Sequence, residues 1–283
     1  PKQQKWSHVD TCFFTHHLYF AKDKDQTLWF SQGGPGLSSG VVGWVKMKTF
    51  FETGDSARSQ GWTALVLDTN GNGKRDAYTE PGSPADPAKD TRINAPFYSI
   101  MPSPADGSIW GAVMGVPGAV VRIAPGANPP ATAIAEIYNV PMPGFGARGA
   151  DIDSKGVVWV SLGSGHMGSF DRRKCKGPLN GPKATGDHCP EGWSFYQYPG
   201  PGFKGIGENS AESSYYTWVD QHNTFGLGND VPMSTGNLND GLIAYANGRM
   251  VVLRVPYPIG FYAKGFDGRI DNPNAGWKGR GLW

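Results

Sequence analysis

The sequence predicts an all-β protein, and more specifically a β-propeller of four-stranded blades. The chain holds 41 glycines and 23 prolines among 283 residues, too many turn formers for a helical protein. It contains no long segment with the 3.6-residue apolar period of a helix. A tryptophan-centred unit also recurs along the chain. These three observations favour repeated antiparallel sheets.

The clearest copy of the unit is the stretch 149–173. A first strand around Ala150 is followed by a turn at 154–156, a second strand through Trp159, a Gly-rich turn and a third strand that ends at Asp171. The first two strands alternate in polarity, as half-buried strands do. This stretch therefore serves as the template for the other copies.

Further copies centre on Trp29 and Trp110, and Trp110 lies 49 residues before Trp159. Four strands repeated every ~40–50 residues are typical of propeller blades, with a β-sandwich as the alternative. The expected strands are 18–23, 27–31, 40–46 and 62–67, then 98–101, 108–111, 118–123 and 133–138, then 149–152, 158–161, 168–171 and 193–198. A looser unit covers 215–220, 224–228, 240–246 and 248–255, and a fifth begins at 260–262. We expect one propeller domain over 1–283, about five blades or part-blades of a seven-bladed propeller truncated at both ends.

The blade motif resembles that of virginiamycin B lyase-like (streptogramin lyase-like) propellers. The residues that carry the resemblance are Ile152–Ser161 (IDSKGVVWVS) and, more loosely, Asp106–Trp110 (DGSIW). The chain also resembles large secreted bacterial proteins in which such a propeller follows a carboxypeptidase-regulatory-like domain. For lyases of this type the resemblance implies a Mg²⁺ site with a histidine general base and glutamate ligands. That set does not map residue by residue onto this sequence.

Alignment of the units on their tryptophans brings polar residues to the start of each innermost strand, at one mouth of the central channel. His17 is the candidate base or ligand of a channel Mg²⁺ or transition metal, because imidazole titrates near neutral pH. The alternative is that these side chains pack the channel wall and bond to the backbone. The aligned residues are His16, His17, Tyr98, Arg148, Tyr215, Tyr216 and Tyr262.

Four further residues in loops are candidates for the same mouth. His166 follows a Gly-rich turn, His222 follows a strand, and Glu208 and Glu212 precede Tyr215. The predicted catalytic set is His17, Arg148, His166 and Glu212. The predicted binding set is His16, Tyr98, Tyr216, His222 and Tyr262.

The stretch 68–92 is an insertion between the first two units and is expected to be Pro/Gly/Asp-rich coil. Its start reads D-x-N-x-N-G-x-x-D, a spacing that suits Ca²⁺. Position 12 of an EF-hand-like loop falls on Thr79 instead of Glu, and Glu80 follows it. The alternative is a plain Asx/Gly turn. The predicted ligands are Asp68, Asn70, Asn72, Lys74 (through its carbonyl) and Asp76.

Three cysteines bear on the compartment. Cys175 and Cys189 bracket a Pro/Gly-rich loop and are predicted to form a disulfide, with two free thiols as the alternative. Cys12 either pairs outside this chain or is buried. A disulfide favours the periplasm or the extracellular space.

Net charge is +2, and the only tight basic cluster is 172–174, so we expect no nucleic-acid partner. No apolar run reaches ~18–20 residues, so we expect no membrane span. The expected partners are a small molecule, glycan or peptide at the mouth, or other segments of a larger protein.

Three functions remain open at this stage. The first is a secreted lyase- or hydrolase-type enzyme with its site at the channel mouth. The second is a non-catalytic propeller that binds a glycan, a peptide or a protein, and the third is a periplasmic redox component.

Overall fold

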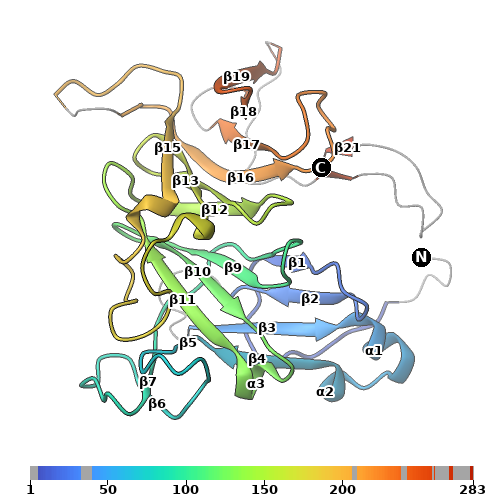
Figure 1. Cartoon of the computed structure of the whole chain (residues 1–283). Coiled ribbons are helices and arrows are strands. Elements are labelled where there is room, and N and C mark those ends of the chain that lie inside the picture. The colour runs from blue at the N-terminus through green and yellow to red at the C-terminus, as the bar shows by residue number, and fades with distance from the viewer. Residues whose placement is uncertain are drawn as a thin grey trace.

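A computed structural model of the chain describes residues 6–32, 40–205, 209–236, 241–256, 258, 268–269 and 281–282. In this part of the chain, four sheets of four or more strands follow one another in an arc, as the blades of a propeller do (Figure 1). They are antiparallel apart from two parallel pairings in the second sheet. We call them blades 1 to 4. The short strands β20 (Gly268–Arg269) and β21 (Gly281–Leu282) form a separate pair. The all-β propeller prediction is therefore confirmed.

Blade 1 has the strand order β1-β2-β3-β4, from the innermost strand outwards. Its turn between β1 and β2 forms because the carboxylate of Asp23 accepts the backbone N–H groups of Asp25 and Thr27. Two short helices, which the sequence pattern did not predict, connect β3 to β4. The elements are β1 (Leu18–Phe20), β2 (Thr27–Phe30), β3 (Val41–Lys46), α1 (Met47–Thr53), α2 (Ser56–Ser59) and β4 (Gln60–Ala64).

Blade 2 is wider than predicted, because strands of the insertion extend its outer edge. The expected single strand 62–67 is wrong. The chain leaves blade 1 after Ala64, and Leu67 pairs in parallel with Ala135 of blade 2. The expected coil of the insertion also contains two short strands. The elements are β5 (Val66–Leu67), β6 (Tyr78–Thr79), β7 (Asp90–Arg92), β8 (Met101–Pro102), β9 (Ile109–Val113), β10 (Ala119–Ala124), α3 (Pro129–Thr132) and β11 (Ile134–Asn139).

Blade 3 follows the predicted pattern throughout. The carboxylate of Asp153 accepts the N–H groups of Lys155 and Val157 and the indole N–H of Trp159, which fixes the first hairpin. The predicted disulfide Cys175–Cys189 is present, with a Cα–Cα distance of 5.1 Å. The elements are β12 (Ala147–Ile152), β13 (Val158–Leu162), β14 (His166–Phe170), the 3₁₀ turns η1 (Arg172–Lys174) and η2 (Pro190–Gly192), and β15 (Trp193–Gln197).

Blade 4 consists of β16 (Ser214–Asp220), β17 (Val231–Gly236), β18 (Gly241–Ala246) and β19 (Arg249–Arg254). The predicted second strand at 224–228 is wrong, because this stretch is a loop and β17 is the second strand. The Asp220 carboxylate accepts the N–H groups of Thr224 and Phe225, which turns the chain. Phe225 packs as a loop residue against the apolar cluster around Trp218. The fifth unit at 260–262 lies outside the described residues.

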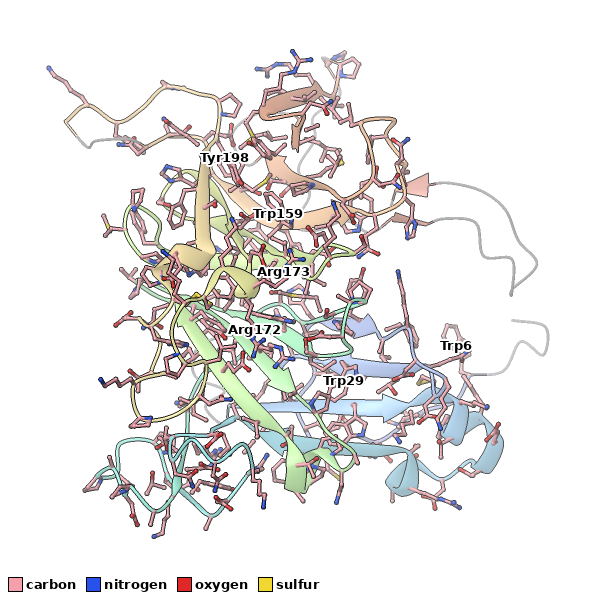
Figure 2. The ribbon with its side chains drawn as sticks, in the orientation of Figure 1. Trp6, Trp29, Trp159, Arg172, Arg173 and Tyr198 are labelled. Carbon is pink, nitrogen blue, oxygen red and sulfur yellow. A yellow bond between two sulfur atoms is a disulfide. The ribbon has the colours of Figure 1, made fainter. Side chains whose placement is uncertain are left out.

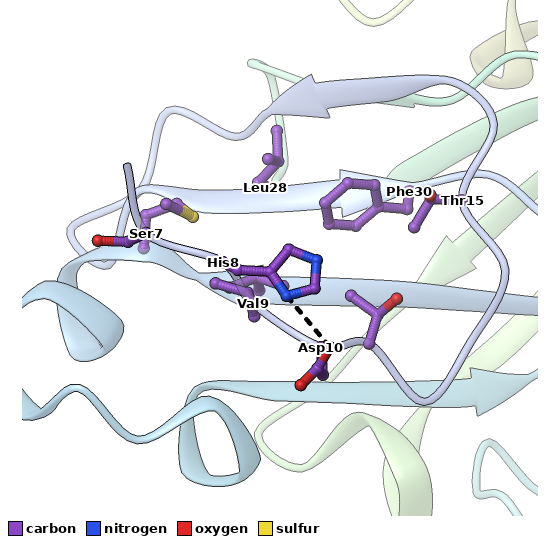
Figure 3. Close-up of a pocket in the computed structure, with 10 residues that line it drawn as sticks. Ser7, His8, Val9, Asp10, Thr15, Leu28 and Phe30 are labelled. Atoms are coloured by element: carbon purple, nitrogen blue, oxygen red, sulfur yellow. Dashed lines mark ion pairs between the residues drawn. The ribbon is translucent and has the colours of Figure 1, made fainter. Parts of the chain in front are cut away.

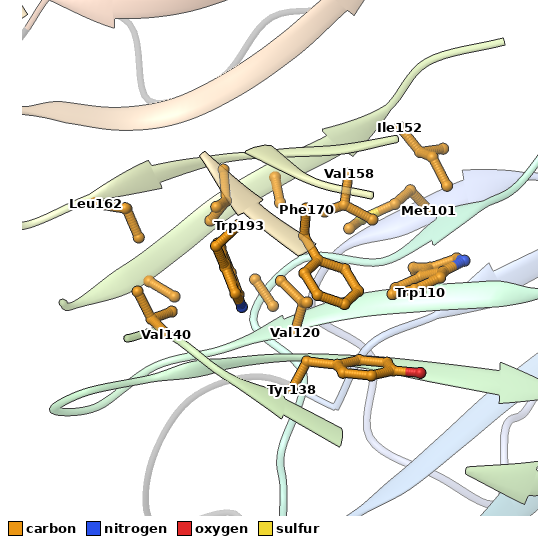
Figure 4. Close-up of a cluster of buried hydrophobic side chains, with 14 of the residues drawn as sticks. Met101, Trp110, Val120, Tyr138, Val140, Ile152, Val158, Leu162, Phe170 and Trp193 are labelled. Atoms are coloured by element: carbon orange, nitrogen blue, oxygen red, sulfur yellow. The ribbon is translucent and has the colours of Figure 1, made fainter. Parts of the chain in front are cut away.

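Apolar side chains fill the spaces between successive blades, and the three repeat tryptophans mark those interfaces. Trp29 belongs to the cluster between blades 1 and 2, and Trp159 packs on the one between blades 3 and 4 (Figure 2). Trp110 belongs to the cluster between blades 2 and 3 (Figure 4). Figure 4 shows the second interface, where the rings of Tyr138 and Phe170 lie 4.4 Å apart. Each large side chain buried in this way contributes about 1.5–3 kcal/mol.

A buried ion cluster joins blades 2 and 3. The Glu136 side chain is 4% exposed, and its carboxylate accepts two hydrogen bonds from Arg172, of 2.5 and 2.7 Å, and one of 3.1 Å from Arg122. Arg173 pairs with Asp171 instead. Two members of the predicted basic cluster at 172–174 are therefore already paired with carboxylates (Figure 2). In the described part of the chain, no helix is long and apolar enough to cross a membrane.

Candidate functional site

Six of the residues predicted at the channel mouth lie together in the structure. They stand just before or at the start of the innermost strands β1, β8, β12 and β16, so all four blades contribute. We call this group the mouth cluster. Its members are His16, His17, Tyr98, Arg148, Tyr215 and Tyr216.

Blade 1 holds its histidines through the buried residue Ser31. The Ser31 hydroxyl accepts the backbone N–H of His17 at 2.9 Å and donates to the carbonyl of Tyr98 at 3.2 Å. The His16 N–H donates to the Ser31 carbonyl, and the Ser31 N–H donates to the carbonyl of His17. Ser31 thus fixes the His16–His17 backbone and ties it to blade 2. The sequence analysis did not single out this residue, and its only signal is a serine at the end of β2.

The imidazole of His17 lies among aromatic rings from blades 1, 2 and 4. Its centroid is 4.3 Å from that of His16, 4.9 Å from that of Tyr98 and 5.5 Å from that of Tyr216. Gly149 makes the Tyr216 position possible, because a Cβ at Gly149 would lie 2.2 Å from that ring and 2.7 Å from the Cα of Tyr216. The inner strands of blades 3 and 4 can approach this closely only because residue 149 is glycine.

The guanidinium of Arg148 lies over the ring of Tyr215, 4.0 Å from its centroid, and 5.5 Å from the centroid of Tyr98. The hydroxyl of Tyr98 donates to that of Tyr215 at 2.6 Å. Arg148 is exposed, whereas Tyr98 is buried. A cation is therefore presented to solvent on a platform of two hydrogen-bonded tyrosines.

The mouth cluster combines a neutral imidazole, that of His17, with a charged guanidinium, that of Arg148. Burial and the neighbouring His16 lower the pKa of His17 to about 4, so this imidazole is neutral at pH 7. Its buried Nε2 has no hydrogen-bond partner within the described residues. Burial opposes the charge of Arg148, but hydrogen bonding to Tyr215 and Tyr98 outweighs it and raises the pKa of Arg148. Burial and the bond with Tyr215 raise the pKa of Tyr98 to about 12.

The structure places the remaining described candidates on β14 and in the loops before and after β16. His166 is buried on β14, the third strand of blade 3, where its Nδ1 lies 3.1 Å from the Ser164 hydroxyl. Glu212 is buried in the loop before β16, and its backbone N–H donates to the Ser210 hydroxyl. His222 follows the far end of β16, opposite the end that carries Tyr216, so its expected place at this mouth is wrong. Tyr262 and Glu208 lie outside the described residues.

The structure also bears on Cys12 and on the predicted metal ligands. Cys12 is free and exposed, so the alternative of a buried Cys12 is wrong. Across the described ranges, no three His, Cys, Asp or Glu side chains group closely enough to hold a metal by themselves. The predicted calcium ligands of the stretch 68–76 do lie in one loop, with Asn70 and Asn72 both bonded to Asp76.

A groove of about 540 Å³ lies on blade 1, between the segment 7–15 and the strands β2 and β3 (Figure 3). The segment 7–15 crosses β2 and β3 here, over Leu28, Phe30 and Val45, and His8 pairs with Asp10 at 3.2 Å. Sequence reasoning did not predict this groove. It is separate from the mouth cluster.

Comparisons with known proteins support the fold. No family model matches the chain, and no curated protein does. Among solved structures, virginiamycin B lyase from Staphylococcus aureus, a catalytically inactive variant with quinupristin, matches with a TM-score of 0.50 at 12% identity. That match covers 90% of this chain and 60% of the lyase.

Two other propellers match less closely. YCF48 bound to D1 peptide has a TM-score of 0.45 at 12% identity and covers 88% of this chain and 57% of its own. PorZ, a surface component of the type-IX secretion system of Porphyromonas gingivalis, has a TM-score of 0.48 at 10% identity. That match covers 94% of this chain and 32% of PorZ. This chain therefore spans less than two thirds of each protein. At these identities the likeness concerns the propeller fold alone.

Proposed function

We propose that this protein is a binding propeller whose channel mouth captures a ligand carrying a carboxylate. The observation that carries the proposal is the exposed guanidinium of Arg148, held over the ring of Tyr215 at 4.0 Å. The ligand is a small molecule, an acidic glycan or an acidic peptide, and Arg148 is the residue that recognises its charge.

The stacked geometry suits this role for a physical reason. Stacking uses the face of the guanidinium, whereas the N–H groups that form a bidentate pair with a carboxylate lie along its edge. The tyrosine platform orders the side chain before a ligand arrives, so less conformational freedom is lost on binding. The hydrogen bond between Tyr98 and Tyr215 keeps the platform itself in place.

The aromatic part of the cluster completes the site. The rings of Tyr216 and His16 border the neutral imidazole of His17 and offer flat surfaces to a sugar ring or a peptide side chain. A neutral imidazole both donates and accepts a hydrogen bond, and it adds no charge that would compete with Arg148.

An array of acidic and neutral oligosaccharides and peptides tests the proposal. We expect the wild-type chain to retain acidic members preferentially, and Arg148→Gln to lose that preference. Arg249→Gln is the matched control, because Arg249 is also exposed but lies on the outermost strand of blade 4. Equal retention of neutral and acidic members, or an unchanged Arg148→Gln variant, contradicts the proposal.

A second candidate, a lyase or hydrolase, rests on His17. Its imidazole is neutral at pH 7 and its Nε2 is unpartnered among the described residues, as a general base requires. A pKa of about 4 makes it a weak base, which is why binding is proposed first. Incubation with a panel of lactones, esters and glycans, quinupristin included, tests it by mass spectrometry. Turnover that His17→Ala abolishes without loss of folding would establish this function.

The Cys175–Cys189 disulfide supports a location in the periplasm or outside the cell. In that location a redox role remains a third candidate, and it predicts absorbance above ~350 nm in the purified protein, from a bound cofactor in the channel. A colourless protein without iron or copper removes it.

A further inference from the structure

The insertion between blades 1 and 2 carries β6 and β7, at the lower left of Figure 1. It brings a buried carboxylate to the loop 68–76. Asp90 begins β7 and is 1% exposed. Its Oδ2 accepts the backbone N–H of Asp76 at 2.7 Å, so the carboxylate faces the loop. Its Oδ1 is buried and has no hydrogen-bond partner in the described part of the chain. A buried carboxylate oxygen without a partner is costly unless it binds a cation.

The side chains of the two residues at the end of the loop pattern, Thr79 and Glu80, bond to other groups. Thr79, at the twelfth position, donates its hydroxyl hydrogen bond to the carbonyl of Asp90. Glu80, one residue later, pairs with Arg92 at 2.7 Å. Asp90 can therefore supply the carboxylate that a glutamate supplies at the twelfth position of an EF-hand. The parallel pairing of β6 and β7 places Asp90 beside the end of the loop pattern.

The loop itself has the shape of a cation-binding loop. Gly73, the sixth residue, has φ +77°, which the sharp turn of such loops requires. The amide N–H groups of Asn70 and Asn72 both donate to Oδ2 of Asp76, at 2.9 and 2.5 Å, so the three side chains meet at one point, and each amide would turn its oxygen toward a cation bound there. Asp68 accepts the N–H groups of Gly71, Asn72 and Gly73, which shapes the turn.

The carboxylates of Asp68, Asp76 and Asp90 lie close together at this place, with the cations Lys74 and Arg75 beside them. Asp68 and Asp90 are the buried ones among them. The neighbouring cation Arg75 donates instead to Thr63 and to the carbonyls of Ala64 and Ala133. A divalent cation would neutralise the repulsion that remains among the three carboxylates.

We propose that the loop 68–76 binds one Ca²⁺ and that Asp90, from outside the loop, closes the site. The ligands would be oxygens of Asp68, Asn70, Asn72, Asp76 and Asp90 and the carbonyl of Lys74. This mixed set of carboxylates, amides and a carbonyl suits a hard ion that takes 6–8 oxygen ligands. It does not depend on three converging acidic side chains, which the described residues lack.

The site would tie the insertion to the rest of the fold. The carbonyl of Asp68 accepts the N–H of Gly181, which lies in the disulfide-closed loop of blade 3. Asp90 belongs to the strand that widens blade 2. Ca²⁺ bound between them would lock the outer edges of two blades and leave the mouth cluster unchanged.

The test is Ca²⁺ titration of the EGTA-treated full chain by calorimetry, together with its thermal midpoint. We expect one Ca²⁺ per chain and a midpoint that rises with Ca²⁺. Asp90→Asn should weaken Ca²⁺ binding at least tenfold, yet raise the midpoint in EGTA because it removes one of the repelling charges. The matched control Asp86→Asn removes a half-buried carboxylate, paired with Lys89, from the same insertion and should leave Ca²⁺ binding unchanged.

Three results would overturn the proposal: no heat and no change in the midpoint up to 5 mM Ca²⁺, an equal response to Mg²⁺, or unchanged binding in Asp90→Asn. If Asp90→Asn fails to fold, Asn72→Ala provides the same comparison, because Asn72 is exposed. In that variant weakened Ca²⁺ binding supports the site and unchanged binding contradicts it.

Discussion

The hydroxyl of Tyr98 donates a 2.6 Å hydrogen bond to the hydroxyl of Tyr215, a residue 117 positions later in the chain. Tyr98 precedes the inner strand of blade 2 and Tyr215 begins that of blade 4. The guanidinium of Arg148, from the blade between them, lies over both rings. Three blades thus build one cationic platform, which is the basis of the proposed binding function.

Replacement of Arg148 separates the effect of its charge from that of its shape. Arg148→Gln should weaken binding of an acidic ligand about 10- to 100-fold, because a hydrogen bond to a charged group contributes about 1.5–3 kcal/mol. Arg148→Lys should recover part of this loss, since it keeps the charge without the planar fork. Titration calorimetry with an array-selected ligand measures both. Full recovery by lysine would show that the planar geometry is irrelevant.

Ser31→Ala should loosen the mouth cluster from the side of blade 1. The change leaves the buried N–H of His17 and the carbonyl of Tyr98 without their shared partner, which costs about 1–3 kcal/mol of unfolding free energy. Urea denaturation measures the loss, with the exposed Ser83→Ala as the control. A loss no larger than that of the control would mean that Ser31 does not anchor the cluster.

Glu136→Gln should destabilise the interface between blades 2 and 3. The variant leaves Arg172 with a neutral partner, whereas Arg122 keeps its pair with Asp106, and disruption of a buried ion cluster costs about 3–5 kcal/mol. The comparison variant Glu80→Gln breaks the ion pair with Arg92. Because the side chain of Glu80 is 59% exposed, this loss should cost less than about 1 kcal/mol of unfolding free energy. Comparable losses for the two variants in chemical denaturation would contradict the proposed importance of burial.

The stability of the protein should fall as the pH is lowered from 6.5 toward 4. His17 has a pKa of about 4 in the folded protein, whereas the ordinary pKa of histidine is 6.5, so the unfolded chain binds more protons in this range. The pKa of His188 is also lowered by burial and acts in the same direction. His17→Asn should therefore reduce the slope of unfolding free energy against pH without removing it. An unchanged slope would show that His17 is not held neutral.

Loss of the disulfide should destabilise the fold by about 3 kcal/mol, since Cys175 and Cys189 close a loop of ~15 residues. The double variant Cys175→Ser with Cys189→Ser measures this effect in thermal unfolding. The exposed Cys12→Ser is the control and should change little.

Much of the fold could be predicted because its signals are local. Asp23 and Asp153 each accept two backbone N–H groups at the end of an inner strand, so the hairpins form from short sequence motifs. The loop at 224–228 has the sequence pattern of a strand because Phe225 and Leu227 alternate with polar or small residues, although both pack on blade 4 from a loop.

The sequence by itself determined the repeat, the hairpin turns, the disulfide and the set of residues at the start of each inner strand. These features depend on neighbours within a few residues or on a simple period. Only the tertiary structure decided that Arg148 lies on Tyr215, that β5 crosses to blade 2 and that Asp90 reaches the loop 68–76. Such contacts join residues far apart in the chain, and they depend on how the blades pack and twist against one another, which no local pattern encodes.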